Sequence, residues 1–282
     1  DFHSQLEPHE KNAIKHALLA IAQIEVNVKT FWGNLYHHLP KPELNGLGAT
    51  FAECEFRHSE AYSRLLEVLG YNDEFLNVVD IPAVKDRIDY LSKVLKNANS
   101  QDPKSYVSSL LLFSILIENV SLFSQFAIIL SFTRFKGYMK NVSNIIAWTS
   151  VDEQIHANGG IYLINKIREE QPYLLTDEDI ESIYDLVDES IEMESNILDW
   201  IFELGEIEHV SKKNLLDFMK YRVDDSLKKI GMKTRYNVSP EDYRPMVWFE
   251  EEVFANSMDD FFAKRPVDYT KHDKSITAND LF

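Results

Sequence analysis

The stretch ECEFRHSEAY, residues 53–62, places three side chains with acid–base and metal-binding chemistry on one helical face. Glu55, His58 and Tyr62 are separated by three and four residues, the spacing that aligns side chains along a helix. Apolar residues continue the same face, so a carboxylate, an imidazole and a phenol are expected to be buried together. Such a group needs a specific partner, because burying an unpaired ionised carboxylate costs several kcal/mol.

Three further carboxylates fall within apolar helical stripes, where a hydrophobic side chain would be expected. They are Glu25, Glu118 and Glu153, and the last is followed by His156 at the same Glu-x-x-His spacing. Two divalent cations would neutralise four such acids, and single glutamates on two helices with Glu-x-x-His on two others form the ligand set of dinuclear carboxylate bundles. Oxygen-rich ligation with only two imidazoles suits iron or manganese better than zinc. We therefore predict a site for two metal ions with six ligands: Glu25, Glu55, His58, Glu118, Glu153 and His156.

The Glu-x-x-His spacing alone is a weak signal. A third copy, from Glu206 to His209, follows Gly205 and has no partner carboxylate on a neighbouring stripe, so we interpret it as a solvent-exposed turn. The competing explanation for the other acids is that they form ion pairs at the edge of the core. That explanation requires four independent coincidences, so the metal site is the favoured hypothesis.

Two more side chains are candidates for a role beside the metals. Tyr62 lies one helical turn beyond His58, where a phenol could lose an electron and a proton to an oxidising metal pair. The alternative is a packed core tyrosine whose hydroxyl is bonded to a carboxylate. Asp152 directly precedes Glu153 and could accept the second N–H of His58 or His156, or could be a solvent-facing acid.

Helical periodicity dominates the sequence, which has nine Gly and nine Pro residues and almost no strand-like alternation. We predict an all-α bundle with helices at about 8–39, 43–70, 82–98, 103–131, 134–170, 176–205 and 209–231. No Gly/Ser-rich linker divides these helices, so residues 1–240 are expected to form one domain. Residues 241–282 are expected to form an irregular segment and a flexible C-terminal tail.

The composition argues against two classes of partner. The net charge is −17 and no stretch is rich in Lys or Arg, which disfavours nucleic acid and anionic membrane surfaces. The most apolar run, residues 110–132, is interrupted by polar side chains, so no membrane span is predicted. A single cysteine excludes an internal disulfide framework and is typical of a cytoplasmic protein.

Several motifs resemble the small, radical-generating subunit of class I ribonucleotide reductase, a ferritin-like protein. ECEFRHSEAYSRLLE resembles that family's Glu-x-x-His-x-x-x-Tyr helix, SVDEQIH its Asp-Glu-x-x-His helix, and LIENVSLFSQF the helix with its lone glutamate. PHEKNAIKHALLAIAQIEV resembles the first ligand helix, with Glu25 where the family has Asp or Glu. The C-terminal ITANDLF is similar to the acidic, Phe-ending peptide that docks on the large subunit.

The resemblance implies a ferritin-like bundle in which the six ligands bind two iron or two manganese ions that react with dioxygen. The oxidising equivalent would be stored as a Tyr62 radical or in a high-valent metal cluster, and the large subunit would use it to reduce ribonucleotides to deoxyribonucleotides. Asp152 would act as a relay through His58, and Tyr269 would transfer the radical across the subunit interface. The resemblance also implies a homodimer, and docking through Asp280, Leu281 and Phe282.

Two departures from the family pattern affect these expectations. The positions around the radical tyrosine, usually two Phe and an Ile, read Leu122, Phe126 and Thr149, which favours a metal-centred oxidant such as dimanganese. The family's relay tryptophan lies upstream of the first ligand helix, and none of the four tryptophans here matches it: Trp32, Trp148, Trp200 and Trp248. The alternative function is that of another ferritin-like oxidase or monooxygenase with its own small substrate, which would need neither Tyr62 nor the tail.

Overall fold

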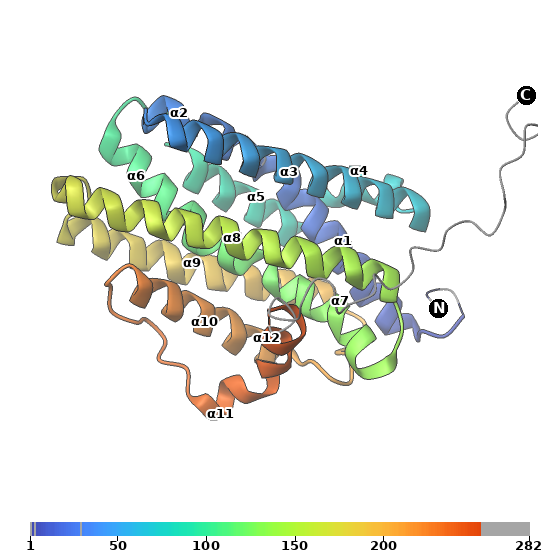
Figure 1. The fold of residues 1–282 in the computed structure, drawn as a ribbon. Helices are drawn as coiled ribbons and strands as arrows, with labels where there is room; N and C mark the ends of the chain where they lie inside the picture. Colours follow the sequence, from blue (N-terminus) through green and yellow to red (C-terminus); the bar gives the residue numbers. More distant parts are fainter. Residues whose placement is uncertain (1, 3, 29, 255–282) are drawn as a thin grey trace, which may run out of the picture.

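The architecture is an all-α bundle, as predicted (Figure 1). The computed structural model describes residue 2, residues 4–28 and residues 30–254. Within these residues the sole extended pairing is an isolated bridge between Ile207 and Val210. Two predicted features of the tail, Tyr269 and the terminal Asp280-Leu281-Phe282, lie outside the described residues.

The centre of the bundle is built from long helical segments that pack lengthwise against one another (Figure 1). They are α1 (Pro8–Val28), α3 (Pro42–Leu69), α8 (Lys140–Glu170) and a continuous run of α6 (Pro103–Leu112), η3 (Phe113–Ser121) and α7 (Phe123–Lys136). Helix α1 packs against α3 and α7, while α8 packs against η3, α7 and α3. Every predicted metal ligand lies on one of these segments.

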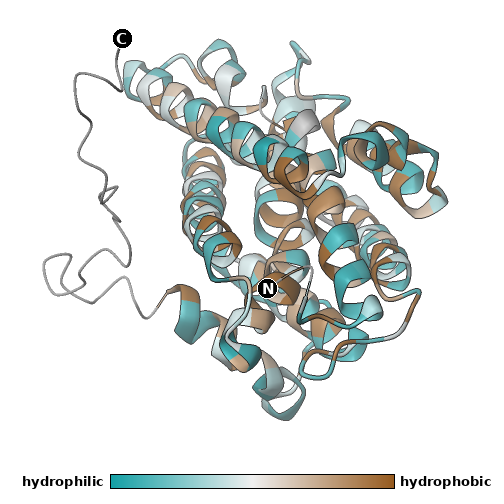
Figure 2. Ribbon diagram, turned by 90° about the vertical axis from the view of Figure 1, so that its right-hand side faces the viewer, coloured by the Kyte–Doolittle hydropathy of each residue, from teal (hydrophilic) through white to brown (hydrophobic). Residues whose placement is uncertain are grey.

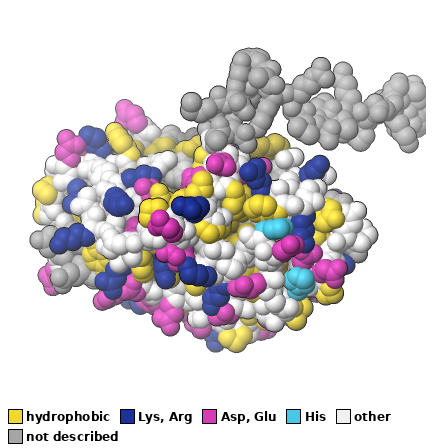
Figure 3. All heavy atoms as spheres, turned by 90° about the horizontal axis from the view of Figure 1, so that it is seen from below, with side chains coloured by type: hydrophobic (Ala, Val, Ile, Leu, Met, Phe, Trp, Pro, Cys, Tyr) yellow, Lys and Arg dark blue, Asp and Glu magenta, His cyan; other side chains and the backbone are white. Residues whose placement is uncertain are grey.

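Further helices cover this centre. The longer ones are α5 (Pro82–Leu95), α9 (Asp177–Ile201) and α10 (Lys212–Lys229). The short ones are η1 (Trp32–Asn34), α2 (Leu35–His38), α4 (Asn72–Asn77), η2 (Val78–Asp80), η4 (Pro172–Leu174), α11 (Pro240–Tyr243), η5 (Arg244–Met246) and α12 (Val247–Val253). Helix α9 packs against α1, α5 and α10, and α10 also packs against η3. On the face seen from below in Figure 3, acidic and basic side chains are interspersed.

Local sequence signals explain where several helices begin and end. Helix α3 begins with a proline in its first turn and ends at Gly70, whose φ of +80° places it in the left-handed region that favours glycine. Helix α6 is capped by Asp102, whose carboxylate accepts a hydrogen bond from the Ser105 amide at 2.9 Å. Helix α7 ends at Gly137, also at positive φ.

The predicted α-helix at 103–131 is interrupted by a π-helical segment, Phe113–Ser121, and continues to Lys136. This segment carries Glu118 and is buried throughout. It meets α8 so closely that a Cβ on Gly160 would lie 1.9 Å from the Ser114 hydroxyl oxygen. Widened π turns occur most often at functional sites, and this one lies where a ligand helix crosses another.

Two other predicted boundaries were wrong. The helix expected at 8–39 ends at Val28, and Trp32–Asn34 forms a separate 3-10 turn before the short α2. The break brings the Trp32 carbonyl against Gly48 of α3, where a Cβ would lie 2.5 Å from that oxygen. The helix expected from residue 134 begins at Lys140, because the glycine turn after α7 separates the two helices.

The segment Pro103–Lys136 is long and apolar enough to cross a membrane by length and composition alone. However, 94% of its most apolar window is buried inside the bundle. Figure 2 shows apolar residues turned toward the middle of the bundle and hydrophilic residues on the outer helix faces. The segment therefore has the surroundings of a core helix.

Candidate metal centre

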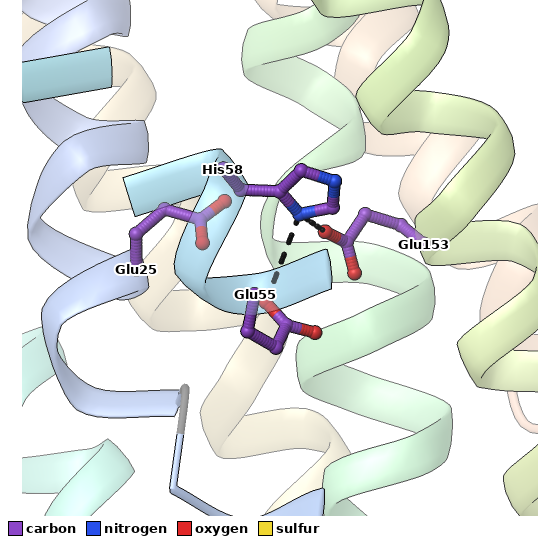
Figure 4. A group of neighbouring side chains, drawn as sticks. All are labelled: Glu25, Glu55, His58 and Glu153. Carbon is purple, nitrogen blue, oxygen red and sulfur yellow. Dashed lines mark ion pairs between the residues drawn. The ribbon is translucent and has the colours of Figure 1, made fainter. Parts of the chain in front are cut away.

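The structure brings all six predicted metal ligands together in the middle of the bundle. Two overlapping groups have ligand atoms within 4.8 Å of one another: one holds Glu25, Glu55, His58 and Glu153, and the other holds Glu55, Glu118, Glu153 and His156. Figure 4 shows the first group converging from α1, α3 and α8. All six residues are buried, and none is more than 5% exposed. Glu55 and Glu153 belong to both groups, so either carboxylate would be available to metal ions held by both groups.

Each imidazole directs Nδ1 toward the carboxylates. His58 Nδ1 lies 2.9 Å from Glu153 Oε1 and 3.8 Å from Glu55 Oε2 (Figure 4). His156 Nδ1 lies 2.8 Å from Glu55 Oε1 and 3.4 Å from Glu153 Oε2. The antiparallel pairing of α3 with α8 produces this near-symmetry, because each helix contributes one Glu-x-x-His at the level of the other.

The electrostatics are those of a cluster that lacks compensating cations. Burial, reinforced by the charges of Glu55 and Glu153, raises the pKa of Glu25 well above its usual value. Burial and the same two charges also raise the pKa of Glu118. Burial opposes the charged form of Glu153 too, but close polar contacts, above all with Glu118 and His156, lower its pKa. The metal-free cluster therefore retains protons that cations would displace.

The pKa values of the two imidazoles are shifted as well, and here burial and the neighbouring carboxylates act in opposite directions. Burial acts to lower their pKa values, but close contacts with the surrounding carboxylates raise the pKa of both His58 and His156 above the usual range. Metal binding would require both rings to lose a proton from Nδ1, so metal affinity should fall with falling pH.

The donor atoms of this site fit a pair of oxygen-preferring metals. In the part of the chain that the structure describes, both carboxylate oxygens of Glu25, Glu55 and Glu153 lack a well-directed hydrogen bond, although all are buried. Nδ1 of His58 and Nδ1 of His156 are also buried without a well-directed hydrogen bond. A buried set of converging but unsatisfied donor atoms is costly unless a cation completes it. Four carboxylates and two imidazoles suit iron or manganese.

Asp152 and Tyr62 both lie beside the cluster, close to His58. Asp152 Oδ2 lies 3.2 Å from Nε2 of His58, the ring nitrogen that faces away from the cluster, and its side chain is 42% exposed. The Tyr62 phenol is 1% exposed, and its hydroxyl adjoins Thr149 without a well-aligned hydrogen bond. Burial, followed by the charge of Glu25, raises the pKa of Tyr62, so the phenol stays protonated.

Sequence reasoning missed one side chain that touches the cluster. Trp32 is fully buried, and its indole Nε1 donates a hydrogen bond of 2.7 Å to Oε1 of Glu118. The helix predicted at about 8–39 includes Trp32, but neither this helix nor its apolar pattern predicts the bond to Glu118. The neighbouring Gly33 was a signal that the helix could end before this point.

A further buried acid lies outside the cluster. Glu194 of α9 is 1% exposed and pairs with the buried Arg87 of α5, with Nη1 and Oε2 3.6 Å apart. Burial raises the pKa of Glu194, and Arg87 partly offsets the effect. This acid is compensated by a protein cation and so needs no metal. The motif from Glu206 to His209 lies in an exposed, non-helical turn, as predicted.

The fold and this site define a class: an all-α bundle with a buried cluster of carboxylates and imidazoles that suits metal ions. The family model described as "Ribonucleotide reductase, small chain" matches residues 1–245. The chain therefore belongs to the ribonucleotide reductase small-chain family, and it is the small subunit of an oxidoreductase. Membership of this family implies association with a large subunit.

A curated protein and two solved structures are similar to this chain in sequence or in fold. The chain is 27% identical to the "Probable ribonucleoside-diphosphate reductase small subunit 376L" of Invertebrate iridescent virus 6, covering 100% of this chain and 87% of that protein. Its fold is similar to that of the ribonucleotide reductase R2 subunit from Clostridium botulinum, with a TM-score of 0.76, 17% identity and coverage of 87% and 77% of the two chains. It is also similar to an R2-like ligand-binding oxidase with a Mn/Fe cofactor, with a TM-score of 0.67, 20% identity and coverage of 80% and 82%.

Proposed function

We propose that this chain is the radical-generating subunit of a class I ribonucleoside-diphosphate reductase. The observation that carries the proposal is the pair of overlapping four-ligand groups that share Glu55 and Glu153. Two iron or two manganese ions per chain would occupy these groups. When bound, the metals would supply an oxidising equivalent by reaction with dioxygen, for use by the large subunit in reducing ribonucleotides.

The surrounding side chains would store the oxidising equivalent and shield it from water. Tyr62 lies one turn from His58 on α3, fully buried, so its phenol is shielded from solvent. Oxidation of this phenol would require its proton to leave, and the nearby Glu25 carboxylate is a buried acceptor. Thr149 places a hydroxyl beside the Tyr62 phenol, where wholly apolar surroundings would protect a radical better. This contact favours storage of the equivalent on the metals.

Asp152 would connect the buried cluster to the subunit surface. Its carboxylate fixes His58 by holding Nε2, which leaves Nδ1 free to bind metal. Because Asp152 is half exposed, it could pass a proton to the surface when the cluster changes its charge. The next residue on this route, by resemblance, is Tyr269 of the tail.

We further propose that the tail docks on the large subunit through Asp280, Leu281 and Phe282. The resemblance of this acidic, Phe-ending peptide to that of the family supports the assignment. A chain that stops after Lys271 keeps Tyr269 but lacks the docking residues. It should bind metal normally and lose affinity for the large subunit, as measured by surface plasmon resonance. Equal affinity of the shortened chain and the 282-residue chain would refute the docking role.

A homodimer is the proposed assembly, and one exposed surface supports it. Trp148, Ile155 and Tyr162 recur at every seventh residue of α8 and are exposed, as is Phe56 of the adjacent α3. An apolar strip of this kind is typical of an interface. Ile155→Asp should shift the protein from dimer toward monomer in analytical ultracentrifugation. Leu76→Asp, on the distant α4, should leave the mass of the assembly unchanged.

The central experiment combines metal analysis with low-temperature EPR on protein loaded with Fe(II) or Mn(II) and exposed to air. Two metals per chain with a narrow signal that disappears in Tyr62→Phe would place the equivalent on the phenol. A multiline metal signal that survives this substitution would place it on the metals. Absence of bound metal would overturn the proposal.

The alternative is an oxidase that converts its own small substrate, as the fold is shared with the R2-like ligand-binding oxidase. The two functions differ in their need for a partner. Ribonucleotide reduction in the presence of a large subunit, lost on removal of the last 11 of the 282 residues, supports the reductase. Substrate oxidation by the small subunit alone, unaffected by that truncation, would support the oxidase.

A further inference from the structure

A buried arginine outside the metal cluster contacts two of the segments that carry predicted ligands. Arg222 of α10 is 4% exposed; α10 packs against η3, and α12 packs against α8 (Figure 1). The guanidinium of Arg222 hydrogen-bonds to the residues that directly follow Glu118 and Glu153. Because burying a charged side chain is costly unless its partners compensate it, these contacts indicate what the arginine does.

The contact between Arg222 and the π segment is reciprocal. Nε of Arg222 donates to the Asn119 carbonyl oxygen at 2.7 Å, and Nη2 donates to the Asn119 side-chain oxygen, Oδ1, at 2.7 Å. The side-chain nitrogen of Asn119 in turn donates to the Arg222 carbonyl oxygen at 3.1 Å and to Ser226 Oγ at 2.7 Å. Helix α10 therefore fixes both the backbone and the side chain of the residue after Glu118.

The same guanidinium contacts three further helices. Nη2 also donates to Gln154 Oε1 at 2.8 Å, and Gln154 directly follows Glu153 on α8. Nη1 donates to Glu250 Oε1 of α12 at 3.3 Å. Cζ of Arg222 lies 3.5 Å from the centre of the Phe123 ring, at the first residue of α7. A guanidinium has its donors in a rigid planar fork, so these contacts together fix its orientation.

These contacts affect the ligands through helix geometry. Successive residues of an α-helix are rotated by about 100° and lie about 1.5 Å apart along the axis. A bond that fixes the residue after a ligand therefore also fixes the rotation of the helix, which determines where the ligand side chain points. The π segment is a rare geometry, so an external contact that holds its backbone at Asn119 also maintains the position of Glu118.

Fastening α10 to the bundle would not by itself require an arginine. An apolar side chain of similar volume would fill this space without the cost of removing a charge from water. Burial lowers the pKa of Arg222 to about 10, so the side chain remains charged at neutral pH. Glu250, the carboxylate to which it donates, has a side chain that is 38% exposed. The buried charge is therefore best explained by its directed, charge-assisted bonds to Asn119 and Gln154.

We propose that Arg222 is a positioning residue for the metal centre, which holds η3 and α8 at the rotation and separation that Glu118 and Glu153 need to share a metal ion. The inference rests on the proposed function, because it requires metal ions in the two ligand groups. Arg222 itself would touch neither metal. It would act through the residue that follows each ligand.

The two ligand groups should respond differently to loss of this arginine. We name them by their histidines: the His58 group is Glu25, Glu55, His58 and Glu153, and the His156 group is Glu55, Glu118, Glu153 and His156. Glu118 belongs to the His156 group alone of these two. Arg222 makes two bonds to the residue after Glu118 and one to the residue after Glu153. Its loss should therefore weaken the His156 group more than the His58 group.

The test is a titration of the metal-free 282-residue chain with Mn(II), followed by equilibrium dialysis and EPR. Wild type should bind two Mn(II) ions per chain. Arg222→Met should bind the first ion about as tightly as wild type and the second about 10–100-fold more weakly, the usual effect of losing an outer partner of a ligand. Its EPR spectrum should then show the resolved hyperfine signal of an isolated Mn(II) where wild type shows a coupled pair. Arg222→Lys should behave in the same way, because an ammonium lacks the planar fork.

The matched control is Arg87→Met, which removes another buried arginine, one that bonds to the Ala20 carbonyl oxygen and pairs with Glu194. This control should lose stability but keep both metal affinities. Equal weakening of both ions in the two methionine variants would show a general effect of instability and would overturn the inference. Wild-type affinities in Arg222→Met would overturn it too.

If Arg222→Met does not fold, Arg222→Lys decides the question, because it keeps the charge and most of the side-chain volume. A second ion bound as tightly as in wild type would then overturn the inference and leave the proposed function intact. Wild type that binds no metal would overturn both proposals.

Discussion

The Asp152 carboxylate holds Nε2 of His58 at 3.2 Å, while Nδ1 of the same ring lies 2.9 Å from Glu153. One imidazole thus has one nitrogen committed to a half-exposed acid and the other to the buried cluster. A partner of this kind fixes both the tautomer and the orientation of a metal-binding histidine.

Asp152→Asn should therefore weaken metal binding without unfolding the bundle. We expect affinity for Fe(II) or Mn(II) to fall by about 10–100-fold, measured by competition with a chelating dye. Glu169→Gln, an exposed acid on the same helix paired with Lys166, is the control and should bind metal normally. Equal affinities for both variants would show that Asp152 does not orient His58.

Glu25→Gln should affect the stability of the metal-free protein and the binding of metal in different ways. Burial and two neighbouring carboxylates raise the pKa of Glu25, so folding without metal must protonate this acid, and the neutral amide removes that cost. The metal-free variant should melt at or above the temperature of the wild type. Saturating metal, which would stabilise the wild type by about 2.7 kcal/mol at 100 Kd, should add little to the variant. Differential scanning calorimetry with and without EDTA gives both quantities.

The contact between α8 and the π segment makes Gly160 sensitive to substitution. Gly160→Ala places a methyl group against Ser114, and such overpacking should cost about 1–3 kcal/mol. The displacement would move Glu118 away from His156, so metal affinity should fall as well. Gly46→Ala, in a helical position with nothing within 4 Å, should instead gain about 0.5–1 kcal/mol. Urea unfolding of the two variants provides the comparison.

The ion pair between Arg87 and Glu194 should resist removal of one partner. Arg87→Met leaves a buried carboxylate without a cation, at an expected cost of about 3–5 kcal/mol. Lys93→Met removes a pair between the same two helices, with Glu189 at 2.6 Å, but this pair is exposed. Its loss should cost less than about 1 kcal/mol. Similar costs for the two variants would contradict the role of burial.

His16 should make stability depend on pH. Burial lowers the pKa of this ring, which stacks on Trp200 and lies 3.1 Å from its carbonyl oxygen through Nδ1. The unfolded chain then binds the proton more readily than the folded one, so stability is lost as the pH falls through the ordinary histidine range. Between about pH 7.5 and about pH 5.5, wild type should lose more stability to urea than His16→Asn, which keeps a donor near Nδ1.

Much of the candidate site could be predicted from the sequence because one physical rule covers all six ligands. A carboxylate on an apolar stripe must meet a compensating charge, and the Glu-x-x-His spacing fixes which neighbours share its face. The rule does not say whether the compensating charge is a metal ion or a protein cation. Glu194 also lies on an apolar stripe, yet Arg87 compensates it, and Arg87 is distant in sequence.

The parts that could not be predicted depend on contacts between helices. Nothing in the residues 113–121 distinguishes a π helix from an α helix, because every side chain there is buried and no polar face marks the turn. The end of α1 at Val28 depends on where Trp32 packs, and its hydrogen-bond partner is 86 residues away. Local propensity carries no information about such a partner.

The carboxylate of Asp152 is half exposed, so at this point a single side chain separates the buried charge from the solvent. Water screens that carboxylate while the surface is open. Any protein that covered this side of α8 would remove the water, lower the local dielectric constant and strengthen the hold of Asp152 on His58. The reactivity of the interior would then be adjusted from outside, by contact alone, with no helix having to move.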